Sequence, residues 1–458
     1  MATPVDQPSE SRFGPADPRR STERLEDLHR ISEQVGNINR QLNDTTVSND
    51  LIRVLQERRA PENRLGRRED LVPVQFDPVP HPRGDIALVA RGELLIRAEA
   101  LPEDRARSLT ENYGLQVQPV EGLDNRLIRL LAPDLRGSQL VELANSLHKD
   151  DTDVSVNYVA PMGVVLKVGL GGPEHSVAKQ RPTRPAPGRG EPVRVAVIDT
   201  GIPRQERGDG WLTGLVRADN IDPLDVLPAP DGWLDLGAGH GTFVTGIIQQ
   251  VAPDADISVY RALDSDGIGD KVLVASEMVR AVRDGAQILN LSFGLETLDD
   301  HPPVAFEVAL EIINEITEET GREVLVVAAA GNFGRTRPSW PAAFHDVVAV
   351  AGLAQDLTPS DWSSRGPWVD CSTMAEGIWS TYVPGQESPL VDPEPEEFVQ
   401  DDWALWTGTS FAAPQVVGAV AKIIQEKDCT PRQALQKLLT GRPEIPGYGR
   451  ALRILPAT

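Results

Sequence analysis

The fold is decided by the stretch Val193-Arg194-Val195-Ala196-Val197-Ile198-Asp199-Thr200-Gly201. Its apolar, largely β-branched part is typical of a strand that is buried on both faces of a parallel sheet. Asp199 ends this run, and Thr200-Gly201 begins a turn. Because the carboxyl ends of strands in open α/β sheets hold the functional site, Asp199 is a candidate site residue. The alternative is an ordinary turn or helix-capping aspartate.

Two later segments, each flanked by small residues, supply a base and a nucleophile. They are Gly239-His240-Gly241-Thr242 and Gly408-Thr409-Ser410-Phe411-Ala412-Ala413-Pro414, and each precedes apolar residues at helical spacing. A neutral imidazole can take a proton from a hydroxyl at neutral pH. We expect Ser410 in the first turn of a helix, where free backbone N–H groups and the helix dipole stabilise negative charge. Alone, Ser410 would be a helix cap; with Asp199 and His240 it indicates a Ser-His-Asp triad.

A fourth segment supplies a hydrogen-bond donor. Residues 324–330 form an apolar run that predicts a buried strand, and the run ends in Gly331-Asn332. The side-chain amide of Asn332 can donate to the oxyanion of a tetrahedral intermediate. Without the other three segments, Gly331-Asn332 would be an ordinary turn.

In these segments the chain resembles the subtilisin-like serine peptidases, the subtilase family, over about Pro192 to Leu455. The order Asp, His, Ser along the chain is the one known from subtilisin. The resemblance implies a doubly wound α/β fold with a mostly parallel sheet. It also implies a serine endopeptidase acting on protein or peptide substrates, in which Asp199 orients His240, His240 activates Ser410, and Asn332 receives the oxyanion.

The resemblance further suggests which residues bind substrate. Residues 290–294 resemble the strand that pairs with the substrate backbone, residues 266–269 the opposite edge of the cleft, and residues 340–342 the wall of the specificity pocket. The substrate-binding candidates are therefore Ser292, Phe293, Gly294, Gly267, Gly269, Ala330, Gly331 and Ala342. Many relatives insert a calcium-binding loop after the histidine helix, but Ile247 to Pro253 runs straight on here. We therefore expect no metal site there and no cofactor.

Composition restricts the setting and the partners. The chain has 458 residues and a formal net charge of −23, which argues against nucleic acid and anionic membranes as partners. It contains two cysteines, Cys371 and Cys429, and no apolar run of about 18 residues that could span a membrane. Its first residues lack the apolar core of a signal peptide. These features predict a cytoplasmic protein with reduced thiols.

The N-terminal part begins with a polar tail and a helical segment. Residues 1–21 are rich in Pro, Ser and charged residues, which predicts disorder. Within residues 22–60 the apolar positions have the spacing of a coiled-coil seam: Leu28, Ile31, Val35, Ile38 and Leu42. Two interpretations remain open, namely association with a partner or a second copy, and packing on the chain itself.

Residues 84–162 alternate between strand and helix patterns. Strands are expected at 86–96, 115–120, 127–131 and 154–159, and helices at 102–113 and 136–148, which is a split βαβ order. By pattern and position this small α+β domain resembles the subtilase pro-domain, which chaperones and inhibits its enzyme. A small adaptor domain of the same fold is the alternative. Residues 163–191 predict an exposed linker, and residues 192–458 the peptidase domain.

An acidic insertion, Glu387 to Asp402, precedes the serine segment. We expect it near the mouth of the cleft, where it either favours basic residues beside the scissile bond or holds the basic linker at 179–184. A solvated surface loop is the alternative. For the whole chain, the alternative to an endopeptidase is a catalytically silent, protease-fold interaction or regulatory protein.

Overall fold

The computed structural model of the chain describes residues 19–60, 73–80, 86–149, 154–161, 172–178, 181–183, 191–216, 219–389 and 394–456. The expected tail therefore lies almost wholly outside the described residues, as does most of the expected linker. None of the described helices is long and apolar enough to cross a membrane.

The C-terminal part is built on an eight-stranded sheet, and its strand order is β18-β19-β13-β12-β11-β10-β7-β8. All neighbouring strands are parallel except β18 and β19. The strands are β7 (Arg194–Asp199), β8 (Asp256–Arg261), β10 (Ile288–Leu291), β11 (Leu325–Ala329), β12 (Val347–Leu353), β13 (Cys371–Met374), β18 (Glu444–Ile445) and β19 (Gly449–Leu452).

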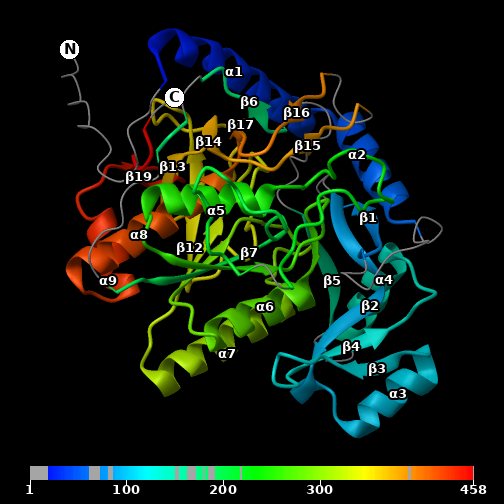
Figure 1. Cartoon of the computed structure of the whole chain (residues 1–458). Helices are drawn as coiled ribbons and strands as arrows, with labels where there is room; N and C mark the ends of the chain where they lie inside the picture. The colour runs from blue at the N-terminus through cyan, green and yellow to red at the C-terminus, as the bar shows by residue number, and fades with distance from the viewer. Residues whose placement is uncertain are drawn as a thin grey trace.

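Helices cover both faces of this sheet, as Figure 1 shows. They are α5 (His240–Val251), α6 (Lys271–Arg283), α7 (Val304–Thr320), α8 (Ala413–Lys427) and α9 (Pro431–Leu439). Alternate residues of β7 point to opposite faces, so Val195 and Val197 join the core under α5 and α8, whereas Ala196 and Ile198 join the core under α6 and α7. This is the doubly wound, mostly parallel α/β fold that the sequence predicts.

A smaller α+β domain precedes it, and its elements lie where the sequence pattern places them. They are β2 (Ile86–Arg97), α3 (Glu103–Tyr113), β3 (Gln116–Pro119), β4 (Leu127–Leu131), α4 (Gly137–Lys149) and β5 (Val154–Pro161). An additional strand, β1 (Phe76–Pro80), pairs with β2 at the edge of the sheet.

This domain packs on α6 and α7, as Figure 1 shows. Its last strand, β5, continues the sheet into the C-terminal domain by pairing antiparallel with β9 (Ile268–Asp270). Ion pairs surround the contact: Arg97 with Glu311, Arg126 with Glu315, and Arg129 with Asp270. The interface between the two domains therefore extends from α6 and α7 to β9.

Two helices precede the small domain. They are α1 (Ser21–Asn43) and α2 (Thr45–Arg58), and both pack on the chain itself. Ile31 and Ile38 of the predicted seam are buried, whereas Leu28 is 40 % exposed. Ile38, with Val35 and Leu42 beside it, thus packs into the core of the C-terminal domain, and Figure 1 shows α1 lying along that domain.

The acidic insertion is folded against a three-stranded sheet beside the main one. That sheet contains β14 (Ile378–Thr381), β17 (Trp403–Trp406) and β6 (Glu174–His175). Within the insertion, β16 (Glu397–Phe398) pairs with β15 (Gly385–Gln386), which directly precedes the insertion. Asp402 contacts Arg181 and His175, and Glu396 contacts His175 and Arg30. The insertion therefore holds Arg181 of the basic linker; Lys179, Gln180 and Arg184 lie outside the described residues.

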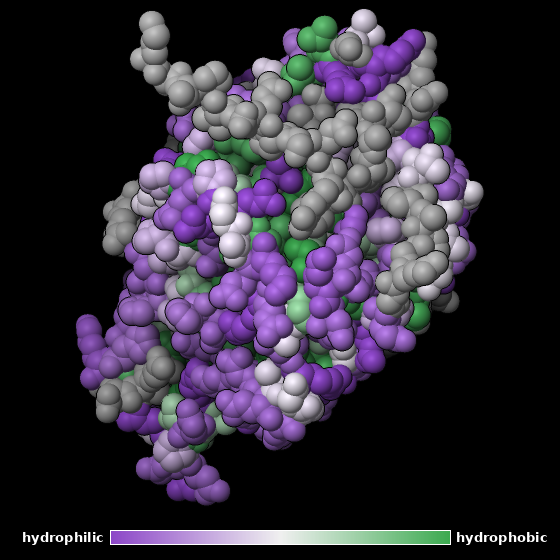
Figure 2. Space-filling view, turned by 90° about the vertical axis from the view of Figure 1, so that its left-hand side faces the viewer, coloured by the Kyte–Doolittle hydropathy of each residue, from purple (hydrophilic) through white to green (hydrophobic). Residues whose placement is uncertain are grey.

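The described surface is predominantly polar on the face shown in Figure 2, where hydrophobic residues show mainly in hollows between hydrophilic ones. This agrees with the strongly acidic composition of the chain.

Candidate active site

Asp199 and His240 lie against each other beneath the surface. Asp199 ends β7, and His240 is the first residue of α5. The His240 Nδ1 lies 2.8 Å from one Asp199 carboxylate oxygen and 3.0 Å from the other. This contact requires the two chain segments to approach closely, and a side chain on Gly241 would collide with the carbonyl oxygen of Gly201. The glycines flanking the two residues therefore make the pairing sterically possible.

A buried aspartate that sequence reasoning missed connects the same two segments. The Asp222 carboxylate accepts hydrogen bonds from the Thr200 hydroxyl at 3.1 Å and from the Gly239 N–H at 2.9 Å. Burial raises the pKa of Asp222 to about 6. No local motif marks Asp222, because its role depends on contacts with residues far away in the sequence.

Ser410 lies in a short 3-10 turn, Thr409–Phe411, and α8 begins only at Ala413. The expectation that Ser410 belongs to the first turn of the long helix is therefore wrong by about one turn. Its hydroxyl donates to the carbonyl oxygen of Ser292 at 2.9 Å, and the Ser292 hydroxyl donates back to the carbonyl oxygen of Ser410 at 2.8 Å. This reciprocal pair joins the serine turn to the segment after β10.

Asn332 is held by the residue before Ser410. Its side-chain oxygen accepts from the Thr409 N–H at 2.9 Å and from the Thr409 hydroxyl at 2.8 Å. With its oxygen engaged in this way, the amide group has its Nδ2 donor end on the side away from Thr409. The orienting role of Thr409 is another contact that sequence patterns do not reveal.

The substrate-binding candidates fall into two edges and a pocket wall. Ser292, Phe293 and Gly294 follow β10, and Ala330-Gly331 follows β11. Gly267 and Gly269 lie at β9, where Gly269 already pairs with Ala160 of β5. Ala342 is fully buried. Of these candidates, Ser292 contacts Ser410 through the reciprocal hydrogen bonds, and the Gly331 N–H donates to the hydroxyl of Thr409, the residue before Ser410. The substrate-binding role of the whole set stays a prediction.

One further lining residue, Ser339, carries no sequence signal. Its buried hydroxyl has no hydrogen-bond partner among the described residues. The Ser339 oxygen lies 2.7 Å from where a Cβ on Gly294 would sit and 3.0 Å from the same point on Gly331. It therefore faces two of the substrate-binding candidates at close range.

The outer side of β9 carries three buried carboxylates, Asp235, Asp264 and Asp266. The end of α2 supplies their cations: Arg59 contacts Asp264 at 2.8 Å and Asp266 at 2.9 Å, and Arg58 contacts Asp235 at 2.6 Å. Burial raises the pKa of Asp235 and of Asp264, while the two guanidinium groups outweigh burial and lower the pKa of Asp266. Asp235 lies five residues before His240, so a short stretch of chain connects this cluster to the candidate active site.

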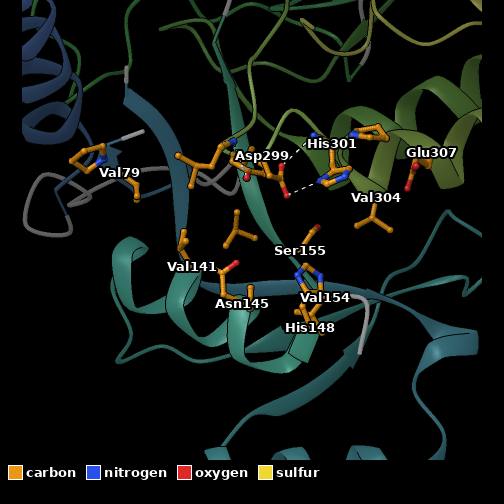
Figure 3. A pocket seen from close by; sticks show the side chains of 16 residues that line it. Val79, Val141, Asn145, His148, Val154, Ser155, Asp299, His301, Val304 and Glu307 are labelled. Atoms are coloured by element: carbon orange, nitrogen blue, oxygen red, sulfur yellow. Dashed lines mark hydrogen bonds and ion pairs between the residues drawn. The ribbon is translucent and has the colours of Figure 1, made fainter. Parts of the chain in front are cut away.

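A separate cavity of about 670 Å³ lies between α4 and β5 of the small domain and the start of α7, as Figure 3 shows. Asp299 and His301 face each other in it, with 3.2 Å between the His301 Nδ1 and an Asp299 oxygen. None of the candidate catalytic residues lines this cavity. It is an interface feature and not part of the candidate active site.

Comparison with known proteins identifies the peptidase part. Residues 190–442 match the sequence model of the Subtilase family. The chain is 29% identical to thermitase of Thermoactinomyces vulgaris over 247 residues, which cover 52% of this chain and 76% of thermitase. It is 30% identical to subtilisin BL of Lederbergia lenta over 246 residues, which cover 52% of this chain and 78% of that protein.

A solved structure resembles a larger part of the fold. Fervidolysin from Fervidobacterium pennivorans, a keratinolytic enzyme related to subtilisin, has a TM-score of 0.53 at 20% identity. The similarity covers 80% of this chain and 60% of that structure. At this identity the likeness concerns the fold.

Proposed function

Because this chain belongs to the subtilase family and is a serine endopeptidase, we propose that Asp199, His240 and Ser410 form its catalytic triad. The observation that carries the proposal is the 2.8 Å contact between His240 Nδ1 and Asp199. It fixes the imidazole so that Nδ1 holds a proton and Nε2 is free to accept one.

In the proposed reaction, the Ser410 hydroxyl turns from the Ser292 carbonyl toward His240 and attacks the peptide carbonyl. His240 takes the serine proton and then gives it to the leaving amine, while Asp199 stabilises the imidazolium. Asn332 Nδ2 and the Ser410 N–H donate to the oxyanion. The two hydrogen bonds from Thr409 to Asn332 Oδ1 support this role, because they direct the amide donor without competing for it.

Active-site labelling with a fluorophosphonate, together with peptide hydrolysis, tests the assignment. Ser410→Ala should lose labelling and turnover while keeping the melting temperature of the wild type. Asn332→Ala should still label but turn over about 10²–10³-fold more slowly, a magnitude established on subtilisin itself. Unchanged turnover in Ser410→Ala would remove the assignment.

We extend the proposal to the small domain, as a pro-domain. The antiparallel pairing of Val159, Ala160 and Pro161 with β9 supports it, because the chain then reaches the cleft edge in an extended form. Wild-type protein should cut itself between about Pro161 and Glu191, whereas Ser410→Ala should stay full length. Mass spectrometry of both proteins gives the answer, and an uncut, fully active wild type would indicate a permanent accessory domain.

A further inference from the structure

Helix α1 runs past the loops that carry Ser410 and Asn332. Ile31 occupies the space beside Gly377, and Leu42 Cδ1 lies 3.2 Å from where a Cβ on Gly334 would sit. Between these two points, Gln34 contacts Thr407, which is three residues before Ser410. Gly334 is two residues after Asn332, so the helix reaches both halves of the candidate catalytic machinery.

These contacts of α1 are buried, like those in the interior of a protein. The buried Gln34 side chain donates to the carbonyl oxygens of Gly172 and Leu405, both at 2.9 Å, and accepts from the Thr407 hydroxyl at 2.7 Å. Ile38 is fully buried in the same core as Trp362, Trp406 and Phe411. In the folded chain, His240 is only 2 % exposed and Ser410 only 4 % exposed.

The helix lies on the side of Ser410 that the small domain leaves uncovered. The extended end of β5 pairs with β9, so β9 marks the side of the cleft that receives the acyl part of a substrate. Thr407 directly follows β17, the strand that pairs with β6, and β6 comes after the proposed cut in the chain, so Thr407 marks the side where the leaving group lies. From Ile31 to Leu42 the helix spans about 16 Å, which corresponds to the length of roughly five extended substrate residues.

We propose that α1 is an end wall on the leaving-group side of the cleft. While α1 is seated, it limits how far a substrate chain can continue beyond the scissile bond, and cleavage within a longer chain, including the proposed cut in this chain itself, requires α1 to move away. The inference rests on the proposed catalytic role of Ser410. It makes α1 a specificity element, because it selects substrates by the length of chain beyond the scissile bond.

The chain provides a place for this movement. Helix α1 ends at Asn43 and α2 begins at Thr45, with Asp44 between them in an extended conformation. Arg58 and Arg59 fix the far end of α2 to buried carboxylates. Helix α1 can therefore turn about Asp44 while α2 stays attached.

Two substrates with the same acyl peptide separate the effect of α1 from catalysis. One ends in a small anilide leaving group, and the other continues for about six residues and carries a donor and quencher pair, long enough to meet α1. Full-length wild type is compared with Ile38→Asp, which places a charge in the core, and with the isosteric Gln34→Glu, which removes two donated hydrogen bonds. Ser32→Asp and Glu33→Gln are matched controls, because both positions are exposed on the same helix.

Both test variants should raise kcat/KM for the long peptide by at least about tenfold, because the apparent affinity scales with the open fraction. The anilide should change less than about twofold, and the controls should match wild type on both substrates. Hydrogen exchange of α1 reports whether the helix has been released. The proposal is wrong if α1 is released in a variant but the ratio of kcat/KM between the two substrates does not change. It is also wrong if wild type already cleaves the long peptide as readily as the variants do. If wild type and variants are all as inactive as Ser410→Ala, the proposed function is wrong, and this inference, which rests on it, is wrong as well.

Discussion

Helices α1 and α2 are consecutive in the chain but use different contacts where they approach the candidate active site. Near Ser410, α1 uses uncharged groups, the Gln34 amide and the Ile38 side chain. At the outer side of β9, α2 uses the guanidinium groups of Arg58 and Arg59 against buried carboxylates. The two attachments lie on opposite sides of the candidate active site.

The difference shows which of the two helices is able to leave. When α1 moves away, water can replace the hydrogen bonds of Gln34, and Glu396, which loses Arg30, is partly exposed and keeps His175 as a partner. When α2 moves away, Asp235, Asp264 and Asp266 lose their cations, and removing one partner of a buried ion pair is strongly destabilising. Helix α2 is therefore the fixed anchor, and α1 is the part suited to movement.

The largest effect is expected at the anchor. Arg59→Ala should lower the free energy of unfolding by about 3–5 kcal/mol, because Asp264 and Asp266 would stay buried without this counterion. Chemical denaturation of the full-length protein measures it. A loss below about 1 kcal/mol, the range of exposed pairs, would mean that α2 is attached as loosely as α1.

A smaller effect is expected from the apolar contact of α1. Ile38→Ala removes a fully buried side chain and should cost about 2–3 kcal/mol, at the low end of the range for such changes because α1 can relax outward. Leu28→Ala, at a position 40 % exposed on the same helix, is the control and should stay within about 0.5 kcal/mol. Equal losses of unfolding free energy at the two positions would contradict the orientation of α1 in which Ile38 faces the core.

The pH dependence distinguishes the two attachments further. Hydrogen bonds to Asp402 and Glu396 raise the pKa of His175, beside α1, to about 9. Since the pKa in the unfolded chain is about 6.5, this stabilisation is complete below about pH 6.5 and is lost as the pH rises through about 9. The difference in unfolding free energy between wild type and His175→Gln should therefore be largest at pH 6 and vanish near pH 10. The cost of Arg59→Ala should not fall in this way, because the guanidinium stays charged and the buried Asp264, whose pKa burial raises, becomes less stable without it as the pH rises.

The smallest effect is expected on the exposed face of α2. Arg53 pairs with Glu57 at 2.9 Å, and both side chains are about 60 % exposed. Arg53→Ala should have almost no effect on the free energy of unfolding, and salt should reduce that effect further. A cost similar to that of Arg59→Ala in the same denaturation series would show that charge on α2, and not burial, determines the anchor.

The sequence predicts those parts of the molecule whose chemistry is local. Asp199, His240 and Ser410 each lie in a short glycine-flanked segment next to an apolar strand or helix, so their positions follow from patterns of a few residues. The strands and helices between Ile86 and Val159 follow from periodicity in the same way. Strand β1 escaped prediction because Pro78 and Pro80 interrupt it, and it tolerates them only as an edge strand.

Contacts between distant segments could not be predicted. In the sequence, Arg58 and Arg59 look like the solvated end of a polar helix, and Asp235, Asp264 and Asp266 look like loop residues. Only the folded chain shows that these two cations pair with these three carboxylates in the interior. The orientation of Asn332 by Thr409 depends likewise on two loops that are separated by 77 positions and meet in space.

The positions of β5 and β6 determine how the protein would behave after cleavage of the backbone between these two strands. Strand β5 ends at Pro161 in a ladder with β9, and β6 begins at Glu174 in a ladder with β17. If the backbone were severed between them, each new end would keep its own sheet neighbours, and the two pieces would travel as one particle in gel filtration. The severed protein would then be a heterodimer of two fragments of one gene product, revealed only under denaturing conditions.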